Sequence, residues 1–87
     1  MKTISKKISQ KYFDDVVSGK KKAEFRLNDF DIEEGDTLRL VEADTDNVET
    51  GRVVEKNVTY VWKCNLRETH WPVEEMLEKG VQVISME

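Results

Sequence analysis

The stretch Ser18–Asp29, "SGKKKAEFRLND", decides how the whole chain is interpreted. Three consecutive lysines follow the turn residue Gly19, and from Ala23 onward apolar and polar residues alternate strictly. An alternation with a period of two predicts a β-strand whose apolar side is buried. The predicted buried side consists of Ala23, Phe25 and Leu27. Glu24 and Arg26 then share the opposite side, where residues two apart lie within reach of an ion pair.

The residues before this strand predict a short strand followed by a helix. Lys2–Ser9 alternates weakly, with Ile4 and Ile8 on one side. Ser9 is typical of a helix N-cap, and Gly19 stands where helices commonly end with a left-handed residue. The predicted apolar face of this helix consists of Tyr12, Phe13, Val16 and Val17.

Further strands and a second helix are predicted downstream. Strands over 37–44 and 51–63 are joined by a polar loop, and a strand over 81–86 completes the sheet. Pro72 and the two acidic residues after Val73 favour a short helix before the last strand. The predicted inward residues are Leu38, Leu40, Val54, Val58 and Tyr60, with Trp62 as a core anchor. This order predicts an α+β fold: a small, mostly antiparallel β-barrel or strongly curled sheet with two short helices.

Length and composition favour a single soluble domain over residues 1–87. The chain is 38% hydrophobic and 37% charged. It has no apolar run near the roughly 20 residues that a membrane span needs. The basic N-terminus lacks the apolar segment of a secretory signal, and one Cys with one His is too few for a structural zinc site. We therefore expect a cytoplasmic protein without a metal or cofactor; the sequence leaves its oligomeric state open.

The charges are distributed unevenly along the chain. Residues 1–28 carry eight Lys or Arg and three Asp or Glu, whereas residues 29–87 carry six and fifteen. An acidic second part disfavours extended contact with a nucleic-acid duplex. A local basic cleft can still attract one or a few phosphates. Lysines that protect a sheet edge from aggregation are the alternative interpretation.

The residues "GKKKAEFR" fit the pattern Gly-x-Lys-x-x-Glu-x-Arg, with Gly19, Lys21, Glu24 and Arg26 at its fixed positions. The segment "KYFDDVVSG" precedes the pattern, "EEGDTLRL" enters the next strand, and "VQVISM" stands near the end. In these features the chain resembles the ASCH domain family of the PUA-like superfamily. Their order is similar to that of a compact bacterial and phage subfamily of ASCH-like proteins without established function.

The resemblance implies a PUA-like pseudo-barrel with a cleft between the first helix and the barrel, into which the polar residues of the motif project. Members of the superfamily are commonly associated with RNA or modified nucleotides. A small ASCH hydrolase group removes the acetyl group of N(4)-acetylcytidine with a lysine and a threonine of the motif region and a distant glutamate. Lys21 matches that lysine, but Glu24 stands where the threonine would be.

Our leading hypothesis is a binding module whose cleft accepts a nucleotide or a short single-stranded RNA segment. Lys21 and Arg26 would contact a phosphate or a base edge, and Glu24 would orient Arg26 or accept a hydrogen bond from a base. Asn28 lies on the same predicted strand side. Trp71, just before the predicted second helix, would stack on a base. These five residues are the predicted ligand-binding set.

Two alternatives come from other classes of protein. The first is an amidohydrolase acting on a modified nucleoside such as N(4)-acetylcytidine, with Lys21 and Glu24 as catalytic residues. That reaction needs Lys21 to accept a proton, and a nearby carboxylate stabilises its ammonium form instead. We therefore expect no activity on N(4)-acetylcytidine. The second alternative is a protein-interaction accessory module, in which the acidic second part meets a basic partner.

Overall fold

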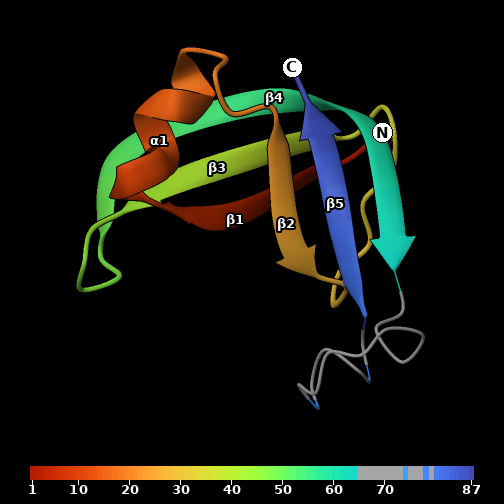
Figure 1. The fold of residues 1–87 in the computed structure, drawn as a ribbon. Helices are drawn as coiled ribbons and strands as arrows, with labels where there is room; N and C mark the ends of the chain where they lie inside the picture. The colour runs from red at the N-terminus through yellow and green to blue at the C-terminus, as the bar shows by residue number, and fades with distance from the viewer. Residues whose placement is uncertain (65–73, 75–77, 79) are drawn as a thin grey trace.

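A computed structural model of the chain describes residues 1–64, 74, 78 and 80–87 (Figure 1). The described part forms five strands and one helix. In chain order they are β1 (Thr3–Ser9), α1 (Gln10–Val17), β2 (Ala23–Leu27), β3 (Thr37–Ala43), β4 (Glu49–Cys64) and β5 (Val81–Met86). The helix predicted to begin at Pro72 lies outside the described residues. The α+β class and the strand positions are confirmed.

The five strands form one curled sheet in the order β1-β3-β4-β5-β2. The β1–β3 pair is parallel and the other three pairs are antiparallel, which confirms a mostly antiparallel sheet. The long strand β4 serves both halves, because its first part pairs with β3 and its last part with β5. In Figure 1, β2 and β5 lie in front of β1 and β3 and run at a steep angle to them. The result is a half-barrel whose two edges are β1 and β2.

Helix α1 begins and ends as its sequence predicts. Ser9 caps its start, since its Oγ accepts a hydrogen bond from the Lys11 N–H at 3.2 Å. The chain leaves the helix through Gly19, whose φ of +82° is readily adopted only by glycine. Of the predicted apolar face, Phe13 and Val16 are buried, whereas Tyr12 and Val17 are exposed. The helix therefore contacts the sheet through a narrower stripe than predicted.

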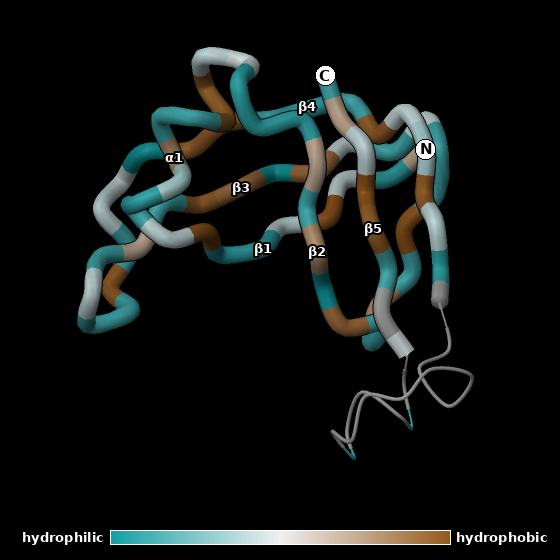
Figure 2. Tube along the Cα trace, in the orientation of Figure 1, coloured by the Kyte–Doolittle hydropathy of each residue, from teal (hydrophilic) through white to brown (hydrophobic). Residues whose placement is uncertain are grey.

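The core fills the concave side of the sheet beneath α1, and Figure 2 shows hydrophobic segments on β3 and β5. Nine buried residues form it: Ile8, Phe13, Val16, Ile32, Leu38, Leu40, Val58, Ile84 and Met86. The buried carboxylate of Asp36 binds the N-terminal segment. It accepts hydrogen bonds from the backbone N–H groups of Lys2 and Glu33 at 3.1 and 2.8 Å. Both hydrogen bonds lower the pKa of the Asp36 carboxyl, and the one from Lys2 has the larger effect.

Two aromatic residues of β4 were predicted inside and lie outside. Tyr60 is 58% exposed and Trp62 is 51% exposed, although Val58 is buried. The pairing of β4 with β5 shifts register between Val58 and Tyr60. An irregularity of this kind reverses the side on which the following residues project. Strict alternation from Val58 was therefore the wrong basis for placing both rings.

Candidate functional site: a cleft between the sheet edges

Strand β2 presents its polar side to the inside of the half-barrel. Glu24 is only 5% exposed, whereas Ala23 is exposed and Phe25 is 57% exposed. The predicted burial of Ala23, Phe25 and Leu27 is therefore wrong: Leu27 is only half-buried, on the same outward side. The physical reason is that the carboxylate of Glu24 is fully compensated by neighbouring cations, so a charged side can face inward.

Glu24 binds two cations at once. Its Oε1 makes a short ion pair with Nζ of Lys21. Its Oε2 accepts a hydrogen bond from Nε of Arg26 at 2.9 Å and forms an ion pair with Nη2 at 2.9 Å. The side chains of Lys21 and Arg26 keep 27% and 25% of their surface exposed, against 6% for Glu24. The carboxylate is thus covered, and the two cations lie between it and the solvent.

Arg26 also connects the two edges of the sheet. Its Nη2 donates a hydrogen bond to the backbone carbonyl of Lys7 on β1 at 2.7 Å. Because β1 and β2 are the outer strands of the sheet order, this side chain spans the open side of the half-barrel. The guanidinium is held at one end by Glu24 and at the other by β1, which fixes its orientation.

Arg26 divides the opening between β1 and β2 into two depressions, which together we call the β1–β2 cleft. The half beside α1 has a volume of about 290 Å³. It is lined by Ile8, Ser9, Tyr12, Lys21, Glu24, Phe25 and Arg26. The other half has a volume of about 270 Å³ and is lined by Lys6, Phe25, Arg26, Leu27, Asp29 and Phe30. The predicted motif residues are therefore brought together beside the first helix.

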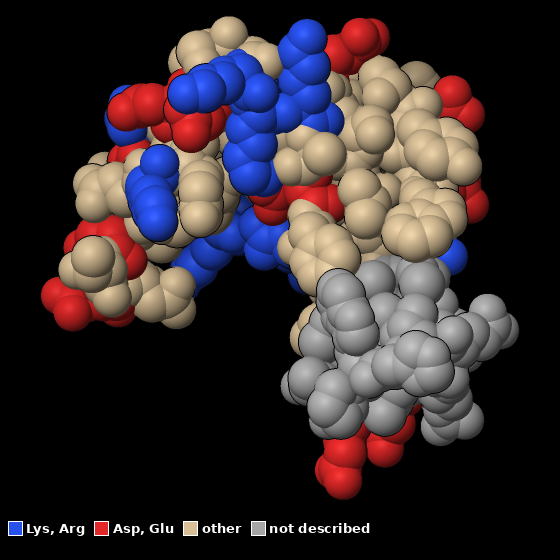
Figure 3. All heavy atoms as spheres, in the orientation of Figure 1, with Lys and Arg blue, Asp and Glu red and all other residues tan. Residues whose placement is uncertain are grey.

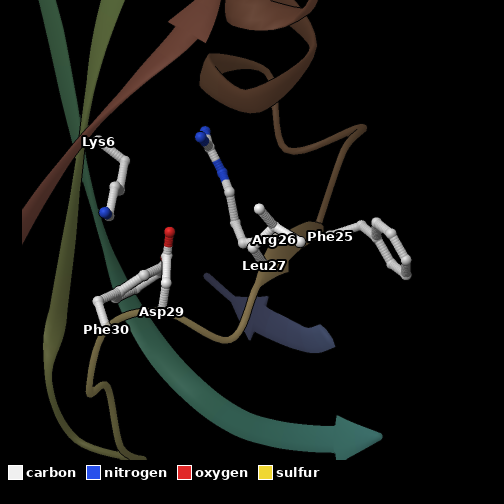
Figure 4. A pocket seen from close by; sticks show the side chains of 6 residues that line it. All are labelled: Lys6, Phe25, Arg26, Leu27, Asp29 and Phe30. Carbon is white, nitrogen blue, oxygen red and sulfur yellow. The ribbon is translucent and has the colours of Figure 1, made fainter. Parts of the chain in front are cut away.

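The second half of the cleft contains a further cation (Figure 4). Nζ of Lys6 lies 4.0 Å from the ring centre of Phe30, a cation–π contact. In Figure 4, Lys6 and Arg26 extend into the same space from opposite strands, and the Phe25 ring points away from it. Among the described residues, Lys6 has no ion pair. The cleft thus contains Lys6, Arg26 and Lys21 along its length.

A second buried glutamate lies near the other side of α1. Glu42 is 1% exposed and accepts hydrogen bonds from Nε and Nη2 of Arg52 at 3.0 and 2.6 Å, and a further one from the Thr50 hydroxyl. Arg52, and then Thr50, lower the pKa of the Glu42 carboxyl, and the same contact raises the pKa of Arg52. Arg52 also binds Asp14 at 3.1 Å and stacks on Phe13 at 4.5 Å.

A family model matches residues 4–73, that of a domain of unknown function designated DUF3850. The chain belongs to the DUF3850 family. The matched range includes α1, β2, β3 and all of β1 except Thr3, and thus every described residue that lines the cleft.

Two individual proteins are similar to this DUF3850 chain. An uncharacterised 12.9 kDa protein of Escherichia phage P2, from the region 3' of GpA, is 53% identical over 55 residues. That match covers 63% of this chain, which spans half of the phage protein's length. The crystal structure of hypothetical protein PH0355 superposes with a TM-score of 0.70, at 20% identity, over 100% of this chain and 98% of the other. At that identity the likeness shows a shared fold.

The remaining predicted site residues of the DUF3850 chain lie elsewhere or outside the described part. Asn28 follows β2 and donates its backbone N–H to the Gly80 carbonyl at 3.2 Å; it lines neither half of the cleft. Trp71 lies outside the described residues. Within those residues no group of three or more His, Cys, Asp or Glu is placed to hold a metal ion, and no helix is long and apolar enough to cross a membrane.

Several residues of these sites were not predicted from the sequence. Lys6 stands between Ile4 and Ile8 at a spacing of two, and Glu42 follows Leu38 and Leu40 at the same spacing. A charged residue in register with buried apolar ones indicates an inward-facing charge that needs a partner. This signal identifies Lys6 and Glu42, but it does not identify the partner strand. Arg52 and Phe30 have no comparable pattern around them.

Proposed function

We propose that this DUF3850 chain is an ASCH-like, PUA-like module that binds a nucleotide or a short single-stranded RNA segment in the β1–β2 cleft. One observation carries the proposal: the buried carboxylate of Glu24 holds Lys21 and Arg26 side by side at the cleft. The half-barrel fold and the Gly-x-Lys-x-x-Glu-x-Arg pattern support the ASCH resemblance, which brings the association with RNA or modified nucleotides.

The charges of the cleft suit a phosphate. Three cations, Lys6, Lys21 and Arg26, and two carboxylates, Glu24 and Asp29, line the cleft, which leaves a surplus of one positive charge. Arg26 is oriented before a ligand arrives, so less side-chain entropy is lost when it binds an anion. A planar guanidinium flanked by ammonium groups fits phosphate oxygens or the acceptor edge of a base.

The contacts of Lys21 favour binding over hydrolysis. Its Nζ donates to the Ala23 carbonyl at 2.6 Å as well as to Glu24, so two of its hydrogen bonds are already made within the protein. The cleft also lacks a free serine or threonine nucleophile among its lining residues, because the Ser9 hydroxyl caps α1. The experiment below therefore treats hydrolysis of N(4)-acetylcytidine as the result that would contradict a binding module.

The test measures the affinity of short fluorescein-labelled single-stranded RNA by anisotropy. We expect Arg26→Gln and Lys21→Gln each to weaken binding about tenfold, since each removes a charge-assisted hydrogen bond. Lys20→Gln is the matched control: it removes an equal charge from the same lysine run, and Lys20 does not line the cleft. Its affinity should stay within about twofold of the wild type.

The salt dependence supplies a second measurement. With one to three phosphates in the cleft, the logarithm of affinity should fall against the logarithm of salt with a slope between about 0.7 and 2. Equal losses in Lys20→Gln and Arg26→Gln would show diffuse charge attraction and contradict a defined site. If the wild type releases cytidine from N(4)-acetylcytidine and Lys21→Ala does not, the protein is a hydrolase and the binding-module proposal is wrong.

A further inference from the structure

The outer side of the β4–β5–β2 half of the sheet carries three exposed aromatic residues. Phe25 is 57%, Tyr60 58% and Trp62 51% exposed. In the strand register Phe25 and Trp62 both pair with Val83, and Tyr60 pairs with Ser85. Residues paired across neighbouring strands project to the same side of a sheet. The three rings therefore belong to one surface, which we call the outer aromatic face: Ala23, Phe25, Tyr60, Trp62, Val83 and Ser85.

Core packing does not account for this surface. The apolar cluster of the described residues is built from aliphatic side chains and Phe13, and none of the three rings contributes to it. Aromatic residues bury much surface and usually stabilise a small domain from inside. A contiguous group of exposed aromatic residues is typical of a binding surface. The placement of the rings thus calls for a ligand rather than a structural role.

The outer aromatic face is continuous with the β1–β2 cleft. Phe25 lines both halves of the cleft and also stands in the outer row, because β2 is the strand at the edge. Figure 4 shows its ring directed away from Arg26, toward the outside. A ligand that occupies the cleft and extends past β2 meets the aromatic residues next.

The distribution of charge identifies the chemistry of that ligand. None of the six residues of the outer aromatic face is charged. The lysine run 20–22 leads directly into β2, and Figure 3 shows basic atoms gathered between α1 and β2 beside a largely uncharged surface over β5 and β4. Single-stranded RNA has the matching composition, with anionic phosphates on one side and flat, weakly polar bases on the other.

We propose that the outer aromatic face stacks the bases of a single-stranded RNA whose phosphates are held in the β1–β2 cleft. The inference rests on the proposed function and deepens it, because it makes the ligand an oligonucleotide of several residues rather than a mononucleotide. Neighbouring strands are about 5 Å apart, so Phe25 and Trp62, separated by one strand, stand roughly 10 Å from each other. Tyr60 and Trp62 are roughly 7 Å apart along β4. These spacings allow successive bases to use different rings.

The experiment compares adenosine monophosphate with a six-nucleotide single-stranded RNA on the full chain. We expect Trp62→Ser and Tyr60→Ser, at two residues that line neither half of the cleft, each to weaken the hexanucleotide about tenfold and to leave the monophosphate within twofold, since a stacked base is lost only from the longer ligand. Trp62→Phe should retain most of the affinity, because it keeps an aromatic surface. Val48→Ser is the matched control: Val48 is 58% exposed and stands in the turn before β4.

The outcomes separate this inference from the proposed function. If Arg26→Gln weakens both ligands while Trp62→Ser and Tyr60→Ser change neither, the cleft binds nucleotides and the aromatic inference is overturned. If the wild type binds neither ligand, the proposed function and the inference fail together. A dimer in sedimentation that Trp62→Ser dissociates, with RNA affinity unchanged, would assign the face to a second copy. Thermal unfolding of each variant within a few degrees of the wild type excludes misfolding as the cause of a loss.

Discussion

Glu24 and Glu42 are two buried glutamates that face the inside of one half-barrel, and each binds an arginine. They differ in what surrounds the ion pair. Arg52 directs two hydrogen bonds at Glu42 and then binds the second carboxylate Asp14. Glu24 binds a second cation, Lys21, and its arginine reaches a backbone carbonyl. The first group has a surplus of negative charge and the second a surplus of positive charge.

The difference separates a structural pair from a candidate site. Neither Glu42 nor Arg52 lines either half of the cleft, and Arg52 covers the ring of Phe13 in the core cluster. Their hydrogen bonds join β3, β4 and α1. Glu24 lies instead in the cleft, and its two cationic partners, Lys21 and Arg26, line the half beside α1 with it. Burial of a carboxylate alone therefore does not mark function; the net charge of its group and the position of that group in the cleft do.

The largest expected effect is on stability, at the Glu42 group. Arg52→Met keeps an apolar stem over Phe13 but leaves the Glu42 carboxylate buried without its cation. We expect Tm to fall by about 10 °C, because the buried Glu42 carboxylate loses the cation that donates two of its hydrogen bonds. Circular dichroism melts give the measurement, with Arg39→Met on β3 as the control. RNA affinity of the variant at low temperature should match the wild type.

The second effect should be mainly on binding, at Glu24. Glu24→Gln keeps a side chain of the same size and removes the charge that orients Arg26. We expect RNA affinity to fall about fivefold to tenfold, since the guanidinium is no longer held in place. Tm should fall by less than in Arg52→Met, because both cations can turn to solvent. A larger loss of stability than in Arg52→Met would reverse the roles given to the two groups.

A third effect concerns acid. The lowered pKa values of Glu42 and Asp36 mean that the folded state holds these carboxylates ionised more strongly than the unfolded chain does. Their contribution to stability is present above the unfolded pKa values, about 4, and is lost as the pH falls through the lowered ones. We expect the urea midpoint to decrease below about pH 4.5. In Glu42→Gln this decrease should be shallower; an unchanged pH profile would remove Glu42 as its cause.

The smallest effect is expected at the rim of the Glu42 group. Asp14 is largely exposed and binds only the outer face of Arg52. An exposed pair contributes little, so Asp14→Ala should change Tm by no more than about 3 °C. Asp15→Ala, its neighbour on α1 without an ion pair among the described residues, is the control. A drop comparable to that of Arg52→Met would mean that Asp14 is part of the structural pair.

The sequence predicted the positions of the elements better than the sides of the strands. The N-cap Ser9, the end of α1 at Gly19 and the strand 81–86 are local features, set by capping, backbone freedom and alternation. Alternation in β2 also predicted that Glu24 and Arg26 share a side. Alternation could not predict which side of β2 is buried. That depends on the ion pair of Glu24 with Lys21 and on the contact of Arg26 with the edge strand β1, which is distant in sequence.

Three aromatic residues also show that alternation does not predict which side of a strand is buried. Phe25, Tyr60 and Trp62 were predicted inside because large apolar side chains usually are. For Tyr60 and Trp62 the register shift in β4 reversed the side, and no residue type at Thr59 signals such a shift. The separation of the chain into a cleft side and an outer aromatic face is thus a tertiary property.

The order of strands in the sheet has a consequence for folding. Strand β2 has its only strand partner among the described residues in β5, more than fifty positions further along the chain, whereas β1, β3 and β4 associate within the first 64 residues. Contacts between distant segments carry a larger loop-closure entropy and slow folding. A partly folded chain in which only β1, β3 and β4 have assembled would already contain the Glu42–Arg52 pair. It would have no cleft, because Glu24 and Arg26 are brought into place only when the last strand joins the sheet.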